Sequence, residues 1–189
     1  MTGFRSVCLI ALGSNLPFDG KDPQSTLTEA LQELSRHGEM IRATSRFFET
    51  PCFPEGAGPD YVNAAAVLET TRDPRGVLAL LHEVEARFGR AREQRWGMRT
   101  LDLDLIGYGD EVLPDRDTWA RWHDLPPESQ VRQAPDALIL PHPRVQDRAF
   151  VLVPLADIAR DWIHPALQRS VAQMCMDLPQ ADRDAVRPI

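Results

Sequence analysis

The sequence predicts an α+β fold, in which helices pack on one face of an antiparallel sheet. Along the chain, the apolar residues show strand spacing in some segments and helix spacing in others, in the order strand, helix, strand, strand, helix, strand. The chain has 189 residues, of which 43% are hydrophobic and 26% charged, as is ordinary for one globular domain. This order is typical of the ferredoxin-like arrangement, which leaves the other sheet face open for an active site. We therefore expect one domain over 1–189, with C-terminal helices completing an αβα architecture.

Local patterns support the first four elements. Residues 7–12 form an apolar run that ends at the tripeptide Gly-Ser-Asn, as a buried strand entering a tight turn would. Leucine and alanine recur at helical spacing over 27–34, after an Asp-Pro pair, and Gly38 ends this helix. The segments 40–49 and 61–70 are rich in β-branched, aromatic or alternating residues and predict two strands.

The last two elements begin at a second Asp-Pro pair. Pro74 precedes apolar residues on one helical stripe, and Gly89 marks the end of that helix. The alternating segment 101–105 then predicts the final strand. Beyond it, we interpret about 112–137 as an insertion, in which two tryptophans at helical spacing follow an aspartate. This insertion could be a lid or a plain surface segment.

Two carboxylates in the final strand are the first candidates for a functional site. Successive side chains of a strand point to opposite sides, so Asp102 and Asp104 share one face, opposite the leucines of the same segment. Neighbouring carboxylates repel each other, and this cost is relieved when they bind Mg²⁺, which prefers oxygen ligands and substrate phosphates. The pair predicts a magnesium site for a phosphate ester. A solvated strand edge is the alternative.

An arginine cluster precedes these aspartates. Five arginines lie between positions 87 and 99, where Glu93 is the one acid. Because the formal net charge of the chain is -7, the cluster favours a site for a polyanion and a metal over a nucleic-acid surface. Arginine supplies 20 of the 21 basic residues, so its spacing, and not its presence, supports this interpretation.

The cysteines and the N-terminal residues indicate a cellular compartment. The three cysteines are widely scattered and lack the spacing of a zinc site or a disulfide framework, so we expect free thiols. The first residues lack a charged stretch followed by a long apolar segment, and no apolar run approaches the length of a membrane span. We expect a cytoplasmic protein without a membrane partner.

Six segments agree with one known family. They are Ala11-Leu12-Gly13-Ser14-Asn15-Leu16, Phe48-Glu49-Thr50-Pro51, Asp60-Tyr61-Val62-Asn63-Ala64-Ala65, the stretch 95–105, Leu140-Pro141-His142-Pro143 and Arg148-Ala149-Phe150-Val151-Leu152. Together, and in this order, they resemble the 6-hydroxymethyl-7,8-dihydropterin pyrophosphokinases of folate biosynthesis along nearly the whole chain.

The resemblance implies a reaction and its cofactor. In this family the β,γ-pyrophosphoryl unit of ATP passes to the hydroxymethyl group of a reduced pterin, by attack on the β-phosphorus, and AMP leaves. Asp102 and Asp104 would then hold two Mg²⁺ ions that bridge phosphate oxygens. The catalytic arginines would be Arg90 and Arg92, on a loop over 89–98 that closes on the transferring phosphates.

The resemblance also implies binding residues for both substrates. The pterin-binding positions are Thr50, Pro51, Phe53, Tyr61, Asn63, Trp96 and Phe150. The ATP-binding positions are Glu85, Arg92, Arg95, Arg99, Leu105, His142 and Arg148. Aromatic rings suit the faces of a flat heterocycle, and an amide offers a donor and an acceptor to its edge. Family likeness further implies a monomer.

The chain departs from the family pattern at several places. Met98 replaces a proline that commonly follows Trp-Gly, and the gap between Arg92 and Arg95 is one residue short. The insertion is longer than the family usually carries. An arginine that the family often has near Ala137 has no equivalent there, and either Arg116 or Arg132 could replace it.

Two other functions are compatible with the residues alone. Ferredoxin-like sheets also serve nucleic-acid or small-ligand binding modules, although an RNA-binding sheet would carry paired aromatics where this chain has the two aspartates. A different Mg²⁺-dependent phosphotransferase could use the same acids and release ADP. The product nucleotide discriminates, because AMP indicates pyrophosphoryl transfer, ADP a simple kinase and no turnover a binding role.

Overall fold

A mostly antiparallel sheet forms the centre of the molecule. The structure is a computed structural model that describes residues 5–52, 58–89, 99–126, 129 and 133–189. Its central strand, β1 (Ser6–Ser14), pairs antiparallel with β4 (Tyr61–Thr70) on one side and with β5 (Asp102–Tyr108) on the other. Beyond β4 lie β2 (Met40–Thr44) and β3 (Phe48–Thr50), and β8 (Arg187–Pro188) pairs with β3. The predicted α+β class is confirmed.

The segment 40–49 differs from its prediction, because it forms two strands and not one. The break falls at Ser45, whose backbone N–H donates to the carbonyl oxygen of Ala65 at 2.9 Å. The Ser45 hydroxyl oxygen accepts the N–H of Ala65, also at 2.9 Å. A side-chain oxygen therefore replaces a backbone carbonyl in the ladder, and the strand is interrupted there.

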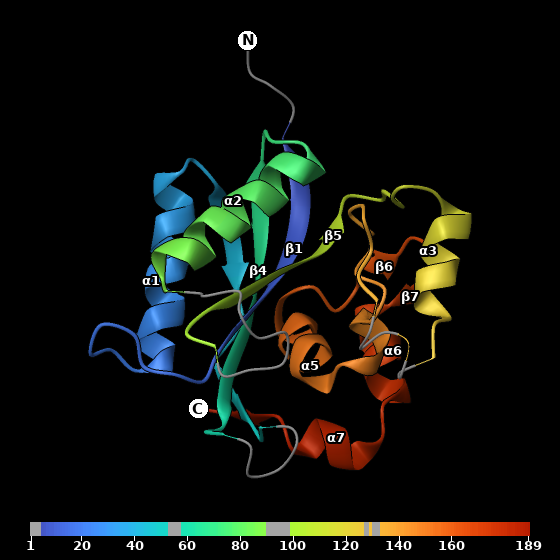
Figure 1. The fold of residues 1–189 in the computed structure, drawn as a ribbon. Helices are drawn as coiled ribbons and strands as arrows, with labels where there is room; N and C mark the ends of the chain where they lie inside the picture. Colours follow the sequence, from blue (N-terminus) through green and yellow to red (C-terminus); the bar gives the residue numbers. More distant parts are fainter. Residues whose placement is uncertain (1–4, 53–57, 90–98, 127–128, 130–132) are drawn as a thin grey trace.

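Two helices cover one face of the sheet, as predicted (Figure 1). They are α1 (Pro23–Arg36) and α2 (Pro74–Arg87), and each begins with a proline after an aspartate. The Asp22 carboxylate accepts the N–H of Ser25, and the Asp73 carboxylate accepts the N–H of Gly76, so both helix starts are capped. Leucines and valines of these helices pack on the sheet in one continuous buried cluster.

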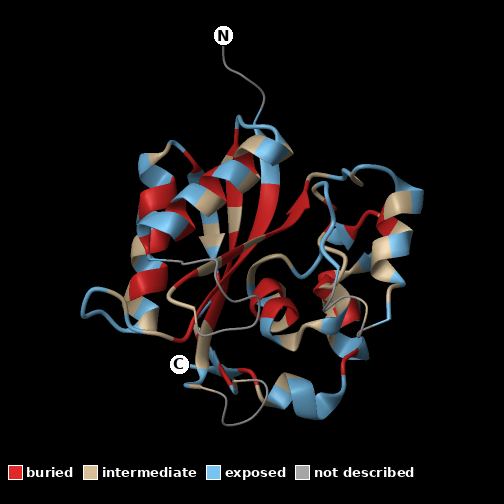
Figure 2. Ribbon diagram, in the orientation of Figure 1, coloured by how far each residue is buried: buried red, intermediate tan, exposed pale blue. Residues whose placement is uncertain are grey.

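The second face of the sheet is only partly open. Helices α5 (Ala149–Ile158) and α6 (Val171–Asp177) cover it where Leu9, Ala65 and Ile106 point outward. These apolar side chains require a cover, and the C-terminal helices provide the expected third layer. Figure 2 shows that the buried residues concentrate in the sheet and on the inner sides of its helices. This face stays exposed at the end of the sheet that carries Asp102 and Asp104, and also at the opposite end, where Val7 and Met40 are 43% and 38% exposed.

The remaining elements lie around the C-terminal helices. They are α3 (Arg116–His123), the short 3-10 helix η1 (Val145–Asp147), the paired strands β6 (Ile163–His164) and β7 (Arg169–Ser170), and α7 (Gln180–Asp184). The predicted helical spacing of Trp119 and Trp122 is matched, because both lie in α3. Among the described residues, no helix is long and apolar enough to cross a membrane.

Candidate active site

The two aspartates lie on one face of β5, as the alternation predicts. Asp102 pairs with Gly13 of β1, and Asp104 pairs with Ala11. Their side chains are 21% and 35% exposed, whereas Leu103, between them, is buried in the core on the opposite face. Both side chains are therefore partly exposed on this face, although Oδ1 of Asp102 is buried.

Each of these carboxylates forms an ion pair with an arginine. The guanidinium Nη1 of Arg99 pairs with Oδ2 of Asp102, and Nη1 of Arg148 lies 3.2 Å from Oδ2 of Asp104. Burial lowers the pKa of Arg99, but the charge and the hydrogen bond of Asp102, together with the charges of Asp104 and Tyr61, outweigh burial and raise that pKa above its ordinary value. The site thus places two positive and two negative groups together, as phosphate and metal binding require.

The donor set at β5 fits Mg²⁺. Two carboxylates on one strand face offer hard oxygen ligands, and Mg²⁺ commonly binds through one or two carboxylates while water and substrate phosphates complete its shell. In the described part of the chain, no group of three or more His, Cys, Asp and Glu side chains is placed to hold a metal. A metal at Asp102 and Asp104 would therefore need phosphate or water ligands.

His142 is fixed beside the same strand. Its backbone N–H donates to the carbonyl oxygen of Ile106 at 2.8 Å, and its Nδ1 accepts the N–H of Arg144 at 3.1 Å. Burial, followed by the charges of Arg148 and Arg144, lowers the pKa of His142 to about 3. The ring is therefore neutral near pH 7, and its Nε2–H is the available donor.

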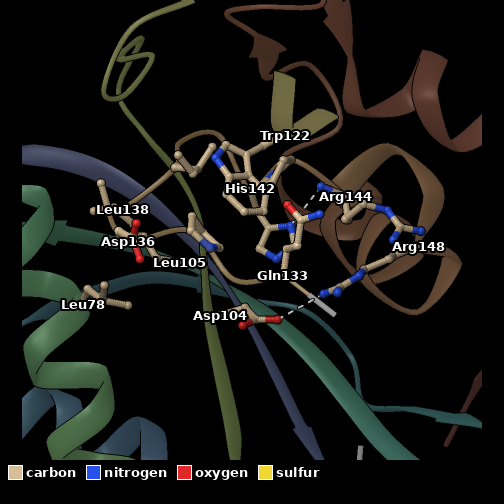
Figure 3. A pocket seen from close by; sticks show the side chains of 14 residues that line it. Leu78, Asp104, Leu105, Trp122, Gln133, Asp136, Leu138, His142, Arg144 and Arg148 are labelled. Carbon is tan, nitrogen blue, oxygen red and sulfur yellow. Dashed lines mark hydrogen bonds and ion pairs between the residues drawn. The ribbon is translucent and has the colours of Figure 1, made fainter. Parts of the chain in front are cut away.

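A cavity of about 480 Å³ lies between β5, the segment before η1 and the insertion (Figure 3). Four of the predicted site residues line it: Asp104, Leu105, His142 and Arg148. It is also lined by residues that the sequence interpretation missed: Leu78, Trp122, Gln133, Pro135, Asp136, Ala137, Leu138, Ile139, Pro143 and Arg144. Three of these residues carried a usable signal: Pro143 belongs to a family segment, Trp122 is one of the two tryptophans noted in the insertion, and Arg144 is a basic residue two positions after His142.

Glu85 and Arg99, which were also predicted to bind ATP, do not line this cavity. Glu85 is 1% exposed, and its Oε1 accepts the backbone N–H of Leu103 at 2.8 Å. Arg99 lies at the other aspartate, Asp102, near Tyr61. The described residues therefore separate the predicted ATP positions into a cavity at Asp104 and a second group around Asp102.

The predicted pterin residues lie next to Asp102. Asn63 is buried, and its Nδ2 donates to the hydroxyl oxygen of Thr50 at 2.7 Å. Gly13 of β1 pairs with Asn63 on one side and with Asp102 on the other. Because directly paired residues of neighbouring strands point to the same face, these three positions form one row across the sheet.

The other predicted pterin residues are more dispersed. Tyr61 is half-buried, and burial raises the pKa of its hydroxyl. Phe150 is 41% exposed at the start of α5, with the Arg148 guanidinium 5.7 Å from the centre of its ring. Pro51 is exposed at the end of β3. Five predicted site residues lie outside the described residues: Phe53, Arg90, Arg92, Arg95 and Trp96.

Comparisons with known proteins agree with this arrangement. The family model of 7,8-dihydro-6-hydroxymethylpterin-pyrophosphokinase (HPPK) matches residues 9–160. A 2-amino-4-hydroxy-6-hydroxymethyldihydropteridine pyrophosphokinase of Synechocystis is 40% identical over 131 residues, which are 69% of this chain and 55% of that protein. The protein of the same name in Haemophilus influenzae is 35% identical over 161 residues, which are 84% of this chain and 85% of that protein.

A solved structure supports the fold alone. The wild-type HPPK-DHPS protein of Plasmodium falciparum matches with a TM-score of 0.63 at 13% identity, over 92% of this chain and 44% of that chain. The present chain therefore spans about half the length of the Synechocystis protein and less than half of the Plasmodium chain.

Proposed function

Because the chain belongs to the 7,8-dihydro-6-hydroxymethylpterin-pyrophosphokinase family, we propose that it transfers pyrophosphate from ATP to 6-hydroxymethyl-7,8-dihydropterin in folate biosynthesis. The hydroxymethyl oxygen attacks the β-phosphorus and loses its proton. The bond from that phosphorus to the oxygen shared with the α-phosphorus breaks, and AMP leaves with that oxygen. The products are the pterin diphosphate and AMP.

The row formed by Asn63, Gly13 and Asp102 is the observation that carries this proposal. It sets an amide suited to a pterin edge on one side of a glycine and a metal-binding carboxylate on the other, each one strand pairing away. Gly13 has no side chain, and this lets the Asn63 amide oxygen lie over it, 3.0 Å from where a Cβ would stand. A pterin held at Asn63 would therefore direct its hydroxymethyl group toward the phosphates at Asp102.

The charged residues would bind the triphosphate. Two Mg²⁺ ions at Asp102 and Asp104 would neutralise the phosphate oxygens and orient the β-phosphorus for in-line attack. Arg148, now paired with Asp104, is placed to exchange that carboxylate for a phosphate oxygen. His142 stays neutral and donates from Nε2, so it contributes a hydrogen bond without adding charge.

The pterin would be held by its edge and its faces. The Nδ2 of Asn63 is occupied by Thr50, which fixes the amide and leaves its Oδ1 as the acceptor for a ring N–H. The backbone at Thr50 and Pro51, with the rings of Tyr61 and Phe150, would complete this subsite.

From the sequence alone, we further propose Phe53 and Trp96 for the pterin, Arg90 and Arg92 as catalytic groups, and Arg95 for ATP.

A nucleotide product assay tests the proposal. ATP, Mg²⁺ and 6-hydroxymethyl-7,8-dihydropterin are incubated with the protein, and each is omitted in turn. We expect AMP only when all three are present. ADP in place of AMP would indicate a simple phosphotransferase, and the absence of turnover with folded protein would favour a binding module.

Several expectations stay predictions. They are a single domain over 1–189 with the insertion at about 112–137, a monomer, a cytoplasmic location and the lack of a nucleic-acid partner. Size measurement by light scattering tests the monomer, with a mass near 21.3 kDa expected.

A further inference from the structure

The insertion contributes a wall of the cavity at Asp104. Trp122 comes from α3, and Gln133 and Asp136 come from the segment that returns from the insertion toward β5. Figure 3 shows the Trp122 ring above His142, with Asp104 at the opposite side of the cavity. Residues of the insertion therefore line the same cavity as Asp104 and His142. We take the ligand of this pocket to be ATP, which rests on the proposed function.

The cavity has a charged side and an apolar side. Arg148, which is paired with Asp104, and Arg144, which is paired with Asp147, lie on one side, and their charges suit phosphates (Figure 3). Leu78, Leu138 and Asp136 lie on the other side. A triphosphate would be repelled by the Asp136 carboxylate, so the phosphates belong at the arginines and the nucleoside at the leucines.

The helix that carries Trp122 is firmly attached to the rest of the site. Trp119, one helical turn earlier, is 5% exposed, and its Nε1–H donates to the carbonyl oxygen of Pro141 at 2.7 Å. Pro141 directly precedes His142 in the chain. At the start of the helix, Asp115 caps the N–H of Thr118 at 2.8 Å. The position of Trp122 relative to His142 is therefore set by a buried contact.

We propose that Trp122 stacks on the purine base of the bound nucleotide. The ring is half-buried and lines the cavity, so part of its surface is exposed to a ligand there. The apolar side chains of Leu78 and Leu138 line the same nucleoside side of the cavity. An aromatic ring with aliphatic side chains matches the two faces of a base, whereas the phosphates gain nothing from it. Trp122 is thus a specificity residue for the nucleoside, supplied by the insertion.

Binding measurements without pterin test this inference directly. Isothermal titration compares MgATP with magnesium tripolyphosphate, which carries the same three phosphates but neither base nor ribose. Trp122→Ala should weaken MgATP binding by about ten-fold, as loss of base stacking does, and leave tripolyphosphate binding unchanged. Trp122→Phe should restore most of the lost affinity. Arg121→Ala, on an exposed position of the same helix, is the matched control and should bind both ligands normally.

The outcomes distinguish this inference from the proposed function. If Trp122→Ala binds MgATP as tightly as the unchanged chain, or loses affinity for both ligands equally, Trp122 does not contact the base. Circular dichroism verifies that the variant is folded. The proposed function fails separately, if the unchanged chain binds MgATP but forms no AMP when pterin is added.

Discussion

Oε1 of Glu85 accepts the backbone N–H of Leu103 at 2.8 Å, and Leu103 lies between the two aspartates of the candidate metal site. β5 is an edge strand of the described sheet, so no further described strand is there to accept the outward N–H of Leu103. A carboxylate from α2 takes that place. This hydrogen bond from the helix therefore fixes the position and direction of the strand segment that carries Asp102 and Asp104.

Replacement of Glu85 should therefore affect both the free energy of unfolding and the Mg²⁺ dependence of activity. Glu85→Ala leaves a buried N–H without this acceptor, which costs about 1–3 kcal/mol of unfolding free energy. Because the strand segment is then less well fixed, the Mg²⁺ concentration for half-maximal activity should rise. Glu85→Gln keeps an amide oxygen as acceptor and should be milder in both respects. Urea unfolding and a magnesium titration of activity measure the two effects, and an unchanged magnesium requirement in Glu85→Ala would confine Glu85 to stability.

Asp104→Asn should abolish turnover and leave the fold intact. The substitution keeps the shape of the side chain but removes the charge that holds a metal, so kcat should fall by about a hundred-fold or more. The lost ion pair to Arg148 is partly exposed and costs at most about 1 kcal/mol of stability. Asp102→Asn should behave in the same way.

The matched control for these two variants is Asp110→Asn. Asp110 is an exposed acid two positions beyond the end of β5, and it is not a proposed ligand. Its replacement should leave kcat and the magnesium dependence unchanged. Normal turnover in Asp104→Asn, measured as AMP formation, would contradict the assignment of the metal to this pair.

Gly13→Ala should raise KM for the pterin and leave KM for ATP unchanged. A Cβ at position 13 would lie 3.0 Å from Oδ1 of Asn63, the acceptor that we propose for the pterin edge. The amide must shift, so KM for the pterin should rise by about ten-fold while KM for ATP stays constant. Steady-state kinetics with each substrate varied in turn gives both values.

A double substitution tests whether Gly13 acts through Asn63. If it does, Gly13→Ala should add little to the effect of Asn63→Ala, because the group that it displaces is already gone. Additive losses in KM for the pterin would mean that residue 13 acts by another route.

The parts of the molecule with strong local signals were predicted well. Both Asp-Pro pairs mark helix starts because an aspartate cap and a proline in the first turn act within three residues of each other. The alternation around Asp102 likewise needs no distant partner, since strand geometry alone sets which side chains share a face.

The parts that depend on distant contacts were not predicted. Trp122 reaches the cavity because Trp119 binds Pro141, 22 positions away, and no local pattern encodes that contact. The break at Ser45 depends on Ala65 in the same way. The sequence predicted that the second sheet face stays open, whereas C-terminal helices cover part of it. The apolar residues on that face require a cover, but they do not by themselves indicate which helix provides it.

His164 should make the stability of the protein dependent on pH. The ring is fully buried between Trp119 and Trp162, and its Nδ1 accepts the N–H groups of Ala166 and Leu167 at 3.2 and 3.1 Å. Nδ1 can accept these bonds only while it is unprotonated. Burial, followed by the charge of His123, lowers the pKa of His164 to about 4.

The sign of this effect is set by linkage between protonation and folding. Between about pH 6.5, the pKa of an unfolded histidine, and about pH 4, the unfolded chain binds a proton at His164 that the folded chain does not. The free energy of unfolding should therefore fall as the pH falls through this window, by at most about 1.4 kcal/mol per pH unit from this residue. His164→Asn retains an acceptor near the position of Nδ1 but does not titrate, so its stability should fall less steeply. Urea unfolding at pH 7, 6 and 5 compares the two slopes, and equal slopes would show that His164 is not the group responsible.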